Sequence, residues 1–394
     1  MMDYSGKNVL VAGSARSGEA ASALLKEQGA IVIMKNISDK LEEEYDIIVQ
    51  SPGIPLELVE NAAPYVIGEF ELGTQFYKGS FLAITGTNGK TTTTMLLHHI
   101  LSFDLNLYGK VNIAGNIGVP LTSLKYEKFP CVVEASSFQL ESIKTFKPKI
   151  AAVLNISEDH LDRHKTMENY IKAKERIFEN QTEEDILILN YKDEICLNMS
   201  KKAKSKIIFF NNGEELLFDK EKLKLQGKHN IENVLAATAM AKAFGVTDEV
   251  IREAIHSFIP PEHRLEYVKT INGTKFYNDS KATNPNSTMH ALNSLKGSIT
   301  LIAGGRLKDT DYRELIPYFT NVKTIIVYGE GTDYLSEIWS DYKVIKADFN
   351  EIVKQALKED CENVLFSPAC ASFDLFKDFE ERGKAFKSLI NLRR

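Results

Sequence analysis

Short apolar runs recur along the chain, with longer amphipathic stretches between them. The first segment contains the runs "NVLVAG", "AIVIM" and "YDIIVQSPG", and a helical stretch separates the first two. A second series comprises "FLAITG", "PCVVEAS", "KIAAVLNIS" and "EDILILN", with helices such as "TTTTMLLHHILS" and "NVLAATAMAKAFG" between or after them. Apolar runs that alternate with helices predict a parallel sheet covered on both faces.

The segment "HSFIPPEHRLE" has a proline pair after a helix, which is typical of a linker. Beyond it, "TKFYNDS", "SITLIAGG", "KTIIVYGEG" and "ENVLFSPA" again predict short buried strands that end in polar turns. We therefore predict an α/β protein of three domains, residues 1–79, 80–260 and 261–394.

The composition excludes several classes of protein. The chain of 394 residues has a net charge of -6 and no basic run, which argues against a nucleic-acid partner. Its four cysteines lack the spacing of a zinc site or a disulfide framework. Because no secretory segment or membrane-length apolar run is found, we expect a cytoplasmic protein without membrane insertion.

The stretch "LAITGTNGKTTTTMLLHHI" predicts a strand, a glycine turn and a helix, the layout of a phosphate-binding loop. The usual P-loop spacing requires a glycine where this chain has Ile84, so the stretch is a damaged nucleotide site, a chance match or a shorter loop of a different kind of enzyme. Backbone amides at a helix N-terminus, a lysine and a hydroxyl suit ATP phosphates and Mg²⁺. The candidate ATP contacts are Gly86, Thr87, Asn88, Gly89, Lys90, Thr91 and Thr92.

Two neighbouring predicted strands end in candidate metal ligands. Glu134 ends "PCVVE" and His160 follows "KIAAVLNIS", at the strand ends where parallel sheets bind ligands. A helix cap is the alternative for Glu134, and a hydrogen-bonded structural role is the alternative for His160. Lys174 falls within an apolar helix face, so it either extends to the surface or serves chemistry as a buried amine.

Other polar turns give weaker signals. The turn Gly13 to Gly18 could hold a phosphorylated ligand, whereas a nicotinamide cofactor would require an acidic residue near Lys35 and Asn36; a structural turn is the remaining alternative. Polar turns in the last segment, "NDSKATNPNS", "AGGRLKDTD" and "SPACASFDLFKDF", indicate either a cleft or ordinary turn and cap chemistry.

Taken in order, "TGTNGKT", "EASSFQLE", "NISEDHLDRH", "YIKAKERIFEN", "GKHNIENVLAA", "HRLE", "NDSKATNP" and "SPACASFDLFKDFEERG" resemble the Mur ligase family along most of the chain. The family consists of ATP-dependent amide ligases of peptidoglycan precursor synthesis. The motifs look most like the branch that adds D-glutamate to UDP-N-acetylmuramoyl-L-alanine. The resemblance implies an N-terminal Rossmann-like domain that binds UDP, a central parallel-sheet P-loop ATPase domain and a C-terminal Rossmann-like domain. It also implies an acyl-phosphate intermediate and two Mg²⁺ ions, and we expect a monomer.

The resemblance also assigns roles to residues. Lys90, His160 and Lys174 would be catalytic, and Thr91, Glu134, His160 and a carbamylated Lys174 would hold the metals. Further nucleotide contacts would be Asn230, Asn233, Arg264 and Asp279. Substrate contacts would be Ser17, Gly53, Asn116, Ser136, Gln139, Lys281, Thr283, Lys308, Ser372 and Phe379, of which the last four would face D-glutamate.

The alternatives are a related ligase with another amino acid or a folate acceptor, and a catalytically silent nucleotide-binding partner. The chain departs from the family pattern at Lys35, Asn36 and Ile37, where a uridine contact is often found, and the first domain is short. The motifs therefore assign no uridine contact to these three positions.

Overall fold

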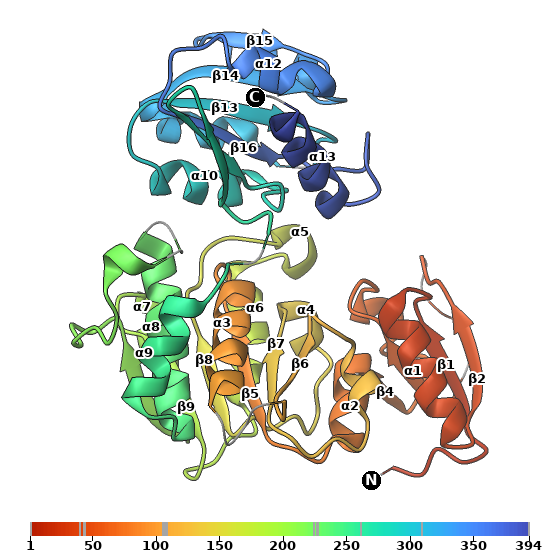
Figure 1. Ribbon diagram of the computed structural model, residues 1–394. Coiled ribbons are helices and arrows are strands. Elements are labelled where there is room, and N and C mark those ends of the chain that lie inside the picture. Colours follow the sequence, from red (N-terminus) through yellow and green to blue (C-terminus); the bar gives the residue numbers. More distant parts are fainter. Residues whose placement is uncertain are drawn as a thin grey trace. The chain divides into compact units, whose positions relative to one another are not determined.

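The computed structural model describes residues 2–38, 41, 45–104, 109–223, 225, 228–260, 262–308 and 310–392. These residues form three sheets (Figure 1). The chain divides into two compact units, residues 1–223 with 232–258 and residues 224–231 with 259–394. The first unit contains two of the sheets, so the boundary that we predict near residue 80 falls within it, and both domain boundaries stay predictions. Across the described ranges, no helix has both the length and the apolar character needed to cross a bilayer.

The first sheet is parallel and has the strand order β2-β1-β3-β4. Its strands are β1 (Asn8–Ala12), β2 (Ile31–Lys35), β3 (Ile47–Gln50) and β4 (Tyr65–Gly68). Its helical segments are α1 (Arg16–Glu27), η1 (Leu56–Leu58) and α2 (Glu69–Phe76). The central strands are buried, whereas the edge strand β2 exposes Ile31 and Ile33.

The second sheet is also fully parallel, with the order β10-β9-β8-β5-β7-β6. Its strands are β5 (Phe81–Thr85), β6 (Asn112–Gly115), β7 (Cys131–Glu134), β8 (Ile150–Val153), β9 (Ile186–Asn190) and β10 (Lys206–Phe210). Its helical segments are α3 (Lys90–Phe103), η2 (Leu121–Leu124), α4 (Ser137–Leu140), α5 (Leu161–His164), α6 (Met167–Glu175), η3 (Arg176–Phe178), α7 (Glu194–Met199), η4 (Lys220–Lys222), α8 (Lys228–Phe244) and α9 (Asp248–Ser257). The strands β5, β7 and β8 are buried along their whole length, as continuous apolar runs predict.

The third sheet has the order β11-β12-β16-β13-β14-β15, and it is mixed because β11 runs antiparallel to β12. Its strands are β11 (Glu266–Ile271), β12 (Thr274–Asn278), β13 (Ile299–Gly304), β14 (Val322–Tyr328), β15 (Val344–Lys346) and β16 (Asn363–Ala369). Its helical segments are α10 (Pro285–Ser294), η5 (Tyr312–Asn321), α11 (Thr332–Ile338), η6 (Phe349–Glu351), α12 (Ile352–Ala356) and α13 (Phe379–Asn391). The predicted α/β class with parallel sheets is confirmed, apart from this antiparallel edge strand, which is common in such sheets.

Two buried carboxylates on α2 tie the first sheet to loops of the second. The side chain of Glu71 accepts hydrogen bonds from the backbone amides of Lys144, Thr145 and Phe146, at 2.9 to 3.1 Å. Glu69 accepts from the backbone amide and the hydroxyl of Thr122 at 2.9 and 2.7 Å. These bonds satisfy backbone donors that burial would otherwise leave unpaired.

Each unit contains two cysteines, and all four thiols are buried and free: Cys131, Cys196, Cys361 and Cys370. Burial raises the pKa of the thiols of Cys131 and Cys370 to about 12. The four thiols form no disulfide with one another.

Candidate active site

The glycine-rich turn connects β5 to α3 at the carboxyl end of the second sheet. Gly86 and Gly89 have φ values of 154° and 82°, a region that favours glycine. A Cβ atom on Gly89 would lie 2.1 Å from Oδ1 of Asn233, so a side chain is excluded here and α8 reaches the loop. The turn thus leads its backbone directly into a helix N-terminus, where phosphates bind.

Two lysines converge on one carbonyl oxygen of this loop. Nζ of Lys90 donates to the carbonyl oxygens of Gly86 at 2.9 Å and Thr87 at 2.7 Å, and Nζ of Lys174 donates to that of Gly86 at 2.7 Å. Lys174 is 1% exposed, so it does not extend to the surface. Its burial, and then the charge of Lys90, place its pKa well below the usual range and favour a neutral amine.

Glu134 is buried at the end of β7, where we expect a metal ligand. Its Oε1 accepts a hydrogen bond from Nδ2 of Asn116 at 2.7 Å, while Oε2 has no hydrogen-bond partner. A buried carboxylate oxygen without a partner is costly, and a bound cation would satisfy it. Asn116 and Glu134, predicted separately as substrate and metal contacts, are therefore direct neighbours.

His160 precedes α5 in the left-handed conformation, with φ at 54°. Its side chain is half exposed, with Nε2 3.5 Å from Oδ2 of Asp159 and the ring 4.9 Å from that of Phe138. The charges of Asp159 and Glu134 both act to raise the pKa of Lys174, so these groups lie within electrostatic reach of the amine. In the ranges that the structure describes, no three His, Cys, Asp or Glu side chains form a cluster able to hold a metal. The four-ligand set with Thr91 therefore stays a prediction.

Ser136 and Gln139 form a capping box at the start of α4, in which each side chain bonds the backbone amide of the other residue. The capping box accounts for both residues structurally. Their predicted substrate contacts would have to use the remaining hydrogen-bonding capacity.

Asn155 is a residue that the sequence analysis did not single out. Its Oδ1 accepts from the backbone amide of Asn88 at 2.8 Å, and its Nδ2 donates to the carbonyl oxygen of Asn88 at 3.2 Å. Thr87 is also held, because its hydroxyl lies 3.1 Å from that of Tyr170 and accepts from the amide of Ser157 at 3.0 Å. Only the position of Asn155 after a buried strand could have indicated this role.

The turns after β1 and β3 lie together at the carboxyl edge of the first sheet. A Cβ atom on Gly13 would lie 2.6 Å from Oγ of Ser51, and that buried hydroxyl has no hydrogen-bond partner. Ser17 lies in the first turn of α1, and Gly53 follows β3. Asn36, part of the departure from the family pattern, accepts from the amide and hydroxyl of Ser14 at 3.0 and 2.9 Å. It therefore supports the glycine turn of the first sheet.

In the second unit, Asp279 is buried where β12 ends. Ser367 and the backbone amide of Leu265 donate to its carboxylate at 2.7 and 3.0 Å. Burial raises its pKa to about 7, against the effect of these hydrogen bonds. Arg264 lies close enough for its charge to lower that pKa, so the two predicted nucleotide contacts are neighbours. Asn230, a third, is buried in the first turn of α8.

The predicted amino-acid site draws on the turns after three strands of the third sheet. Nζ of Lys281 lies 3.8 Å from the ring centroid of Phe379, the first residue of α13. Ser372 is buried, and the charge of Lys308 acts on the thiol of the nearby Cys370. Thr283 lies in the turn before α10. The structure thus brings Lys281 to Phe379 and Lys308 to the turn that contains Ser372.

The chain is similar to known proteins along its whole length. The model of the Mur ligase middle domain matches residues 84–241, and that of the Mur ligase glutamate ligase domain matches residues 263–370. The UDP-N-acetylmuramoylalanine–D-glutamate ligase of a Thermoanaerobacter species is 39% identical over 457 positions, covering 100% of both chains. The same enzyme of Clostridioides difficile is 38% identical and covers 99% of both.

Solved structures agree with the fold. A UDP-N-acetylmuramate-alanine ligase from Thermotoga maritima has a TM-score of 0.63 at 18% identity, covering 98% of this chain and 100% of that one. A MurF ligase of the same organism in complex with ADP has a TM-score of 0.63 at 17% identity, covering 100% and 97%. With both domain models and full-length relatives in agreement, this chain belongs to the Mur ligase family.

Proposed function

We propose that the protein is an ATP-dependent ligase that joins D-glutamate to UDP-N-acetylmuramoyl-L-alanine in peptidoglycan precursor synthesis. The observation that carries the proposal is the full-length identity of 38% to 40% to relatives that bear the name of this enzyme. The convergence of Lys90 and Lys174 on the phosphate-binding loop supports it independently, since a silent nucleotide-binding partner has no need of a second, buried lysine there.

The reaction must first make a carboxylate electrophilic. The γ-phosphoryl group of ATP passes to the L-alanyl carboxylate, which gives an acyl phosphate and ADP. The free amine of D-glutamate then attacks the acyl carbon, the C–O bond to phosphate breaks, and the nitrogen loses a proton, which leaves an amide bond and inorganic phosphate. In this scheme Lys90 neutralises charge on the transferring phosphoryl group, and the backbone of Gly86 to Gly89 positions the ATP phosphates.

The residues at the loop fit bound Mg²⁺. Thr91 offers a hydroxyl and Glu134 a carboxylate oxygen that lacks a hydrogen-bond partner, both of them hard oxygen ligands. The nitrogen of the buried, neutral Lys174 amine would form a bond to the carbon of CO₂ and release a proton to solvent, which gives a carbamate anion that an ammonium cannot form. With His160 these residues would hold two ions, which when bound neutralise the charge that develops in phosphoryl transfer.

In the second unit, we propose that Lys281, Thr283, Lys308, Ser372 and Phe379 receive D-glutamate. The ammonium groups of Lys281 and Lys308 would bind its carboxylates. At the first sheet, Ser17, Gly53 and the unpartnered hydroxyl of Ser51 would hold the UDP part, with Asn36 supporting the turn. A titration with UDP alone tests this assignment, and we expect binding that Gly53→Val weakens.

The decisive experiment measures phosphate release from ATP with UDP-N-acetylmuramoyl-L-alanine against a panel of amino acids. We expect turnover with D-glutamate. Turnover with L-lysine or diaminopimelate in its place would assign the chain to another branch of the family, and activity with a folate acceptor would exclude the proposal. A chain that binds ATP but releases no phosphate with any acceptor would be a silent partner.

A further inference from the structure

Two residues in unfavourable backbone conformations flank Arg264. His263 and Leu265 have φ values of 65° and 46°, so the left-handed region is occupied on both sides of the arginine. Side chains larger than glycine rarely adopt this region, and such strain persists only where surrounding structure imposes it. The turn of residues 262–265 must therefore be held by its neighbours.

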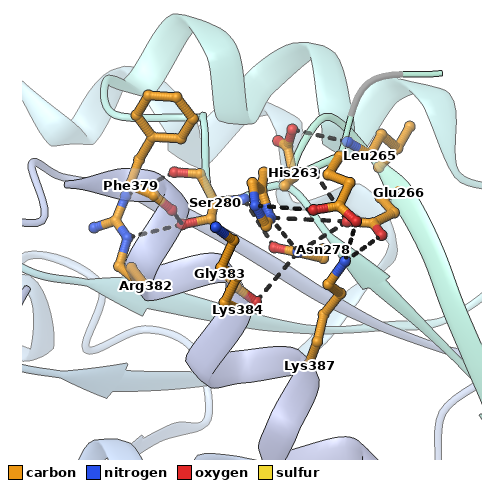
Figure 2. A network of polar contacts seen from close by, with 12 residues as sticks. His263, Leu265, Glu266, Asn278, Ser280, Phe379, Arg382, Gly383, Lys384 and Lys387 are labelled. Atoms are coloured by element: carbon orange, nitrogen blue, oxygen red, sulfur yellow. Dashed lines mark hydrogen bonds and ion pairs between the residues drawn. The ribbon is translucent and has the colours of Figure 1, made fainter.

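Asn278, the last residue of β12, makes side-chain contacts that hold this turn in place (Figure 2). Its side chain is fully buried, and its Nδ2 lies 2.8 Å from Nδ1 of His263 and donates to Oε2 of Glu266 at 3.1 Å. The same Glu266 oxygen accepts from the backbone amide of His263 at 2.9 Å. One amide group thus fixes both the ring and, through Glu266, the backbone of His263.

The helix α13 closes the other side of this arrangement, as Figure 2 shows. A Cβ atom on Gly383 would lie 2.2 Å from Nδ1 of His263, so the ring packs directly on the helix backbone. Lys387 of the same helix donates to Oε1 of Glu266 at 2.8 Å. Burial lowers the pKa of His263, which favours the neutral ring whose Nδ1 can accept from Asn278.

We propose that Asn278 is a positioning residue that sets the affinity for the nucleotide by fixing the backbone on both sides of Arg264. The inference rests on the proposed function and on the nucleotide contact that the family resemblance assigns to Arg264. With Asn278 in place, the turn is held before ATP arrives, so binding does not bear the cost of ordering it. Without Asn278, the turn relaxes from its strained conformation, and the backbone from which the Arg264 side chain extends is no longer fixed.

The test compares ATP affinity, measured by calorimetry, in Asn278→Ala, Arg264→Ala and the double variant of the full-length protein. We expect each single variant to bind ATP about tenfold or more weakly, a difference of about 1.4 kcal/mol. In the Arg264→Ala background, Asn278→Ala should have no further effect, because its role passes through the arginine. An undiminished effect of Asn278→Ala in that background would overturn the inference while leaving the proposed function intact.

A matched control is Asn363→Ala, at the opposite end of the neighbouring strand β16. Asn363 is also buried, and its Nδ2 donates to the carbonyl oxygens of Lys296 and Ser298 at 2.8 and 3.3 Å. We expect this variant to lower the Tm and leave ATP affinity unchanged. An equal loss of affinity in Asn363→Ala would show that general destabilisation explains the effect and would overturn the inference.

The variant Gly383→Ala perturbs the same turn from the side of α13. Alanine improves helix propensity, so a purely local effect on α13 would be neutral or stabilising. We expect weaker ATP binding instead, because the new methyl group displaces the His263 ring from Asn278. Unchanged ATP affinity in a folded Gly383→Ala protein contradicts the inference. If Arg264→Ala itself binds ATP normally, the nucleotide contact assigned to Arg264 is wrong, and this inference is overturned while the proposed function stands.

Discussion

Removal of the Asn155 side chain tests how the phosphate-binding loop is held. Asn155→Ala deletes two hydrogen bonds to the backbone of Asn88, of 2.8 and 3.2 Å, and leaves the rest of the loop unchanged. Each bond contributes a net 0.5 to 1.5 kcal/mol, so about 2 kcal/mol of positioning free energy is lost. If the loop must be ordered to bind the phosphates, that free energy appears as a rise of about 30-fold in the KM for ATP.

The assay is the steady-state rate of phosphate release as a function of ATP concentration, accompanied by a measurement of the Tm. Asn180→Ala is the matched control, because Asn180 is equally half-buried and its Nδ2 also makes two bonds, to the carbonyl oxygens of Lys144 and Phe146 at 3.1 Å each. It lies between η3 and β9, away from the loop. A KM for ATP in Asn155→Ala no higher than in Asn180→Ala would refute the reasoning.

Three further outcomes are expected. Lys174→Ala should lose most activity and recover part of it with added short-chain carboxylic acids. The control Lys172→Ala, at an exposed position, should leave the rate unchanged. Full activity of Lys174→Ala would exclude a carbamate. Burial raises the pKa of Asp279 to about 7, so between about pH 4 and 7 the native state keeps a proton that the unfolded state has lost. The stability of the native state therefore falls as the pH rises through that range. Asp279→Asn should therefore raise the Tm of the ligand-free protein more at pH 8 than at pH 5, and an equal change at both pH values would contradict this. Glu71→Gln places an amide NH₂ group against backbone N–H donors, so it should lower the free energy of unfolding by roughly 3 kcal/mol and the Tm by several degrees. An unchanged Tm would show that water satisfies these donors in place of the carboxylate.

Sequence pattern predicted the parts of the fold that depend on continuous burial. The central strands β5, β7, β8, β13 and β16 are apolar runs because helices cover both of their faces, and the polar turns after them contain most of the candidate site. Helical periodicity also predicted the position of Lys174 on a buried helix face, since its neighbours Tyr170, Ala173 and Ile177 are buried. The pattern alone left open whether the amine itself reaches the surface, and the structure shows that it is buried.

The rest depends on contacts between distant segments, which one sequence does not reveal. Asn155 is an ordinary turn residue until the chain brings it beside Asn88, 67 positions earlier. The left-handed conformations of His263 and Leu265 have no local signal, because glycine would be the usual residue there and the strain is imposed from β12 and α13. The third sheet is mixed for a similar reason, as β11 and β12 are joined by the tight turn at Asn272 and Gly273 rather than by a crossover helix.

The four buried thiols can serve as probes of unfolding in each part of the protein. Thiolate is the species that reacts with alkylating reagents, and both burial and a pKa of about 12 at Cys131 and Cys370 suppress it in the folded chain. Reagents that modify cysteine should therefore leave the native enzyme untouched. Since Cys131 and Cys196 belong to one compact unit and Cys361 and Cys370 to the other, the order in which they become labelled during mild denaturation reports which unit opens first.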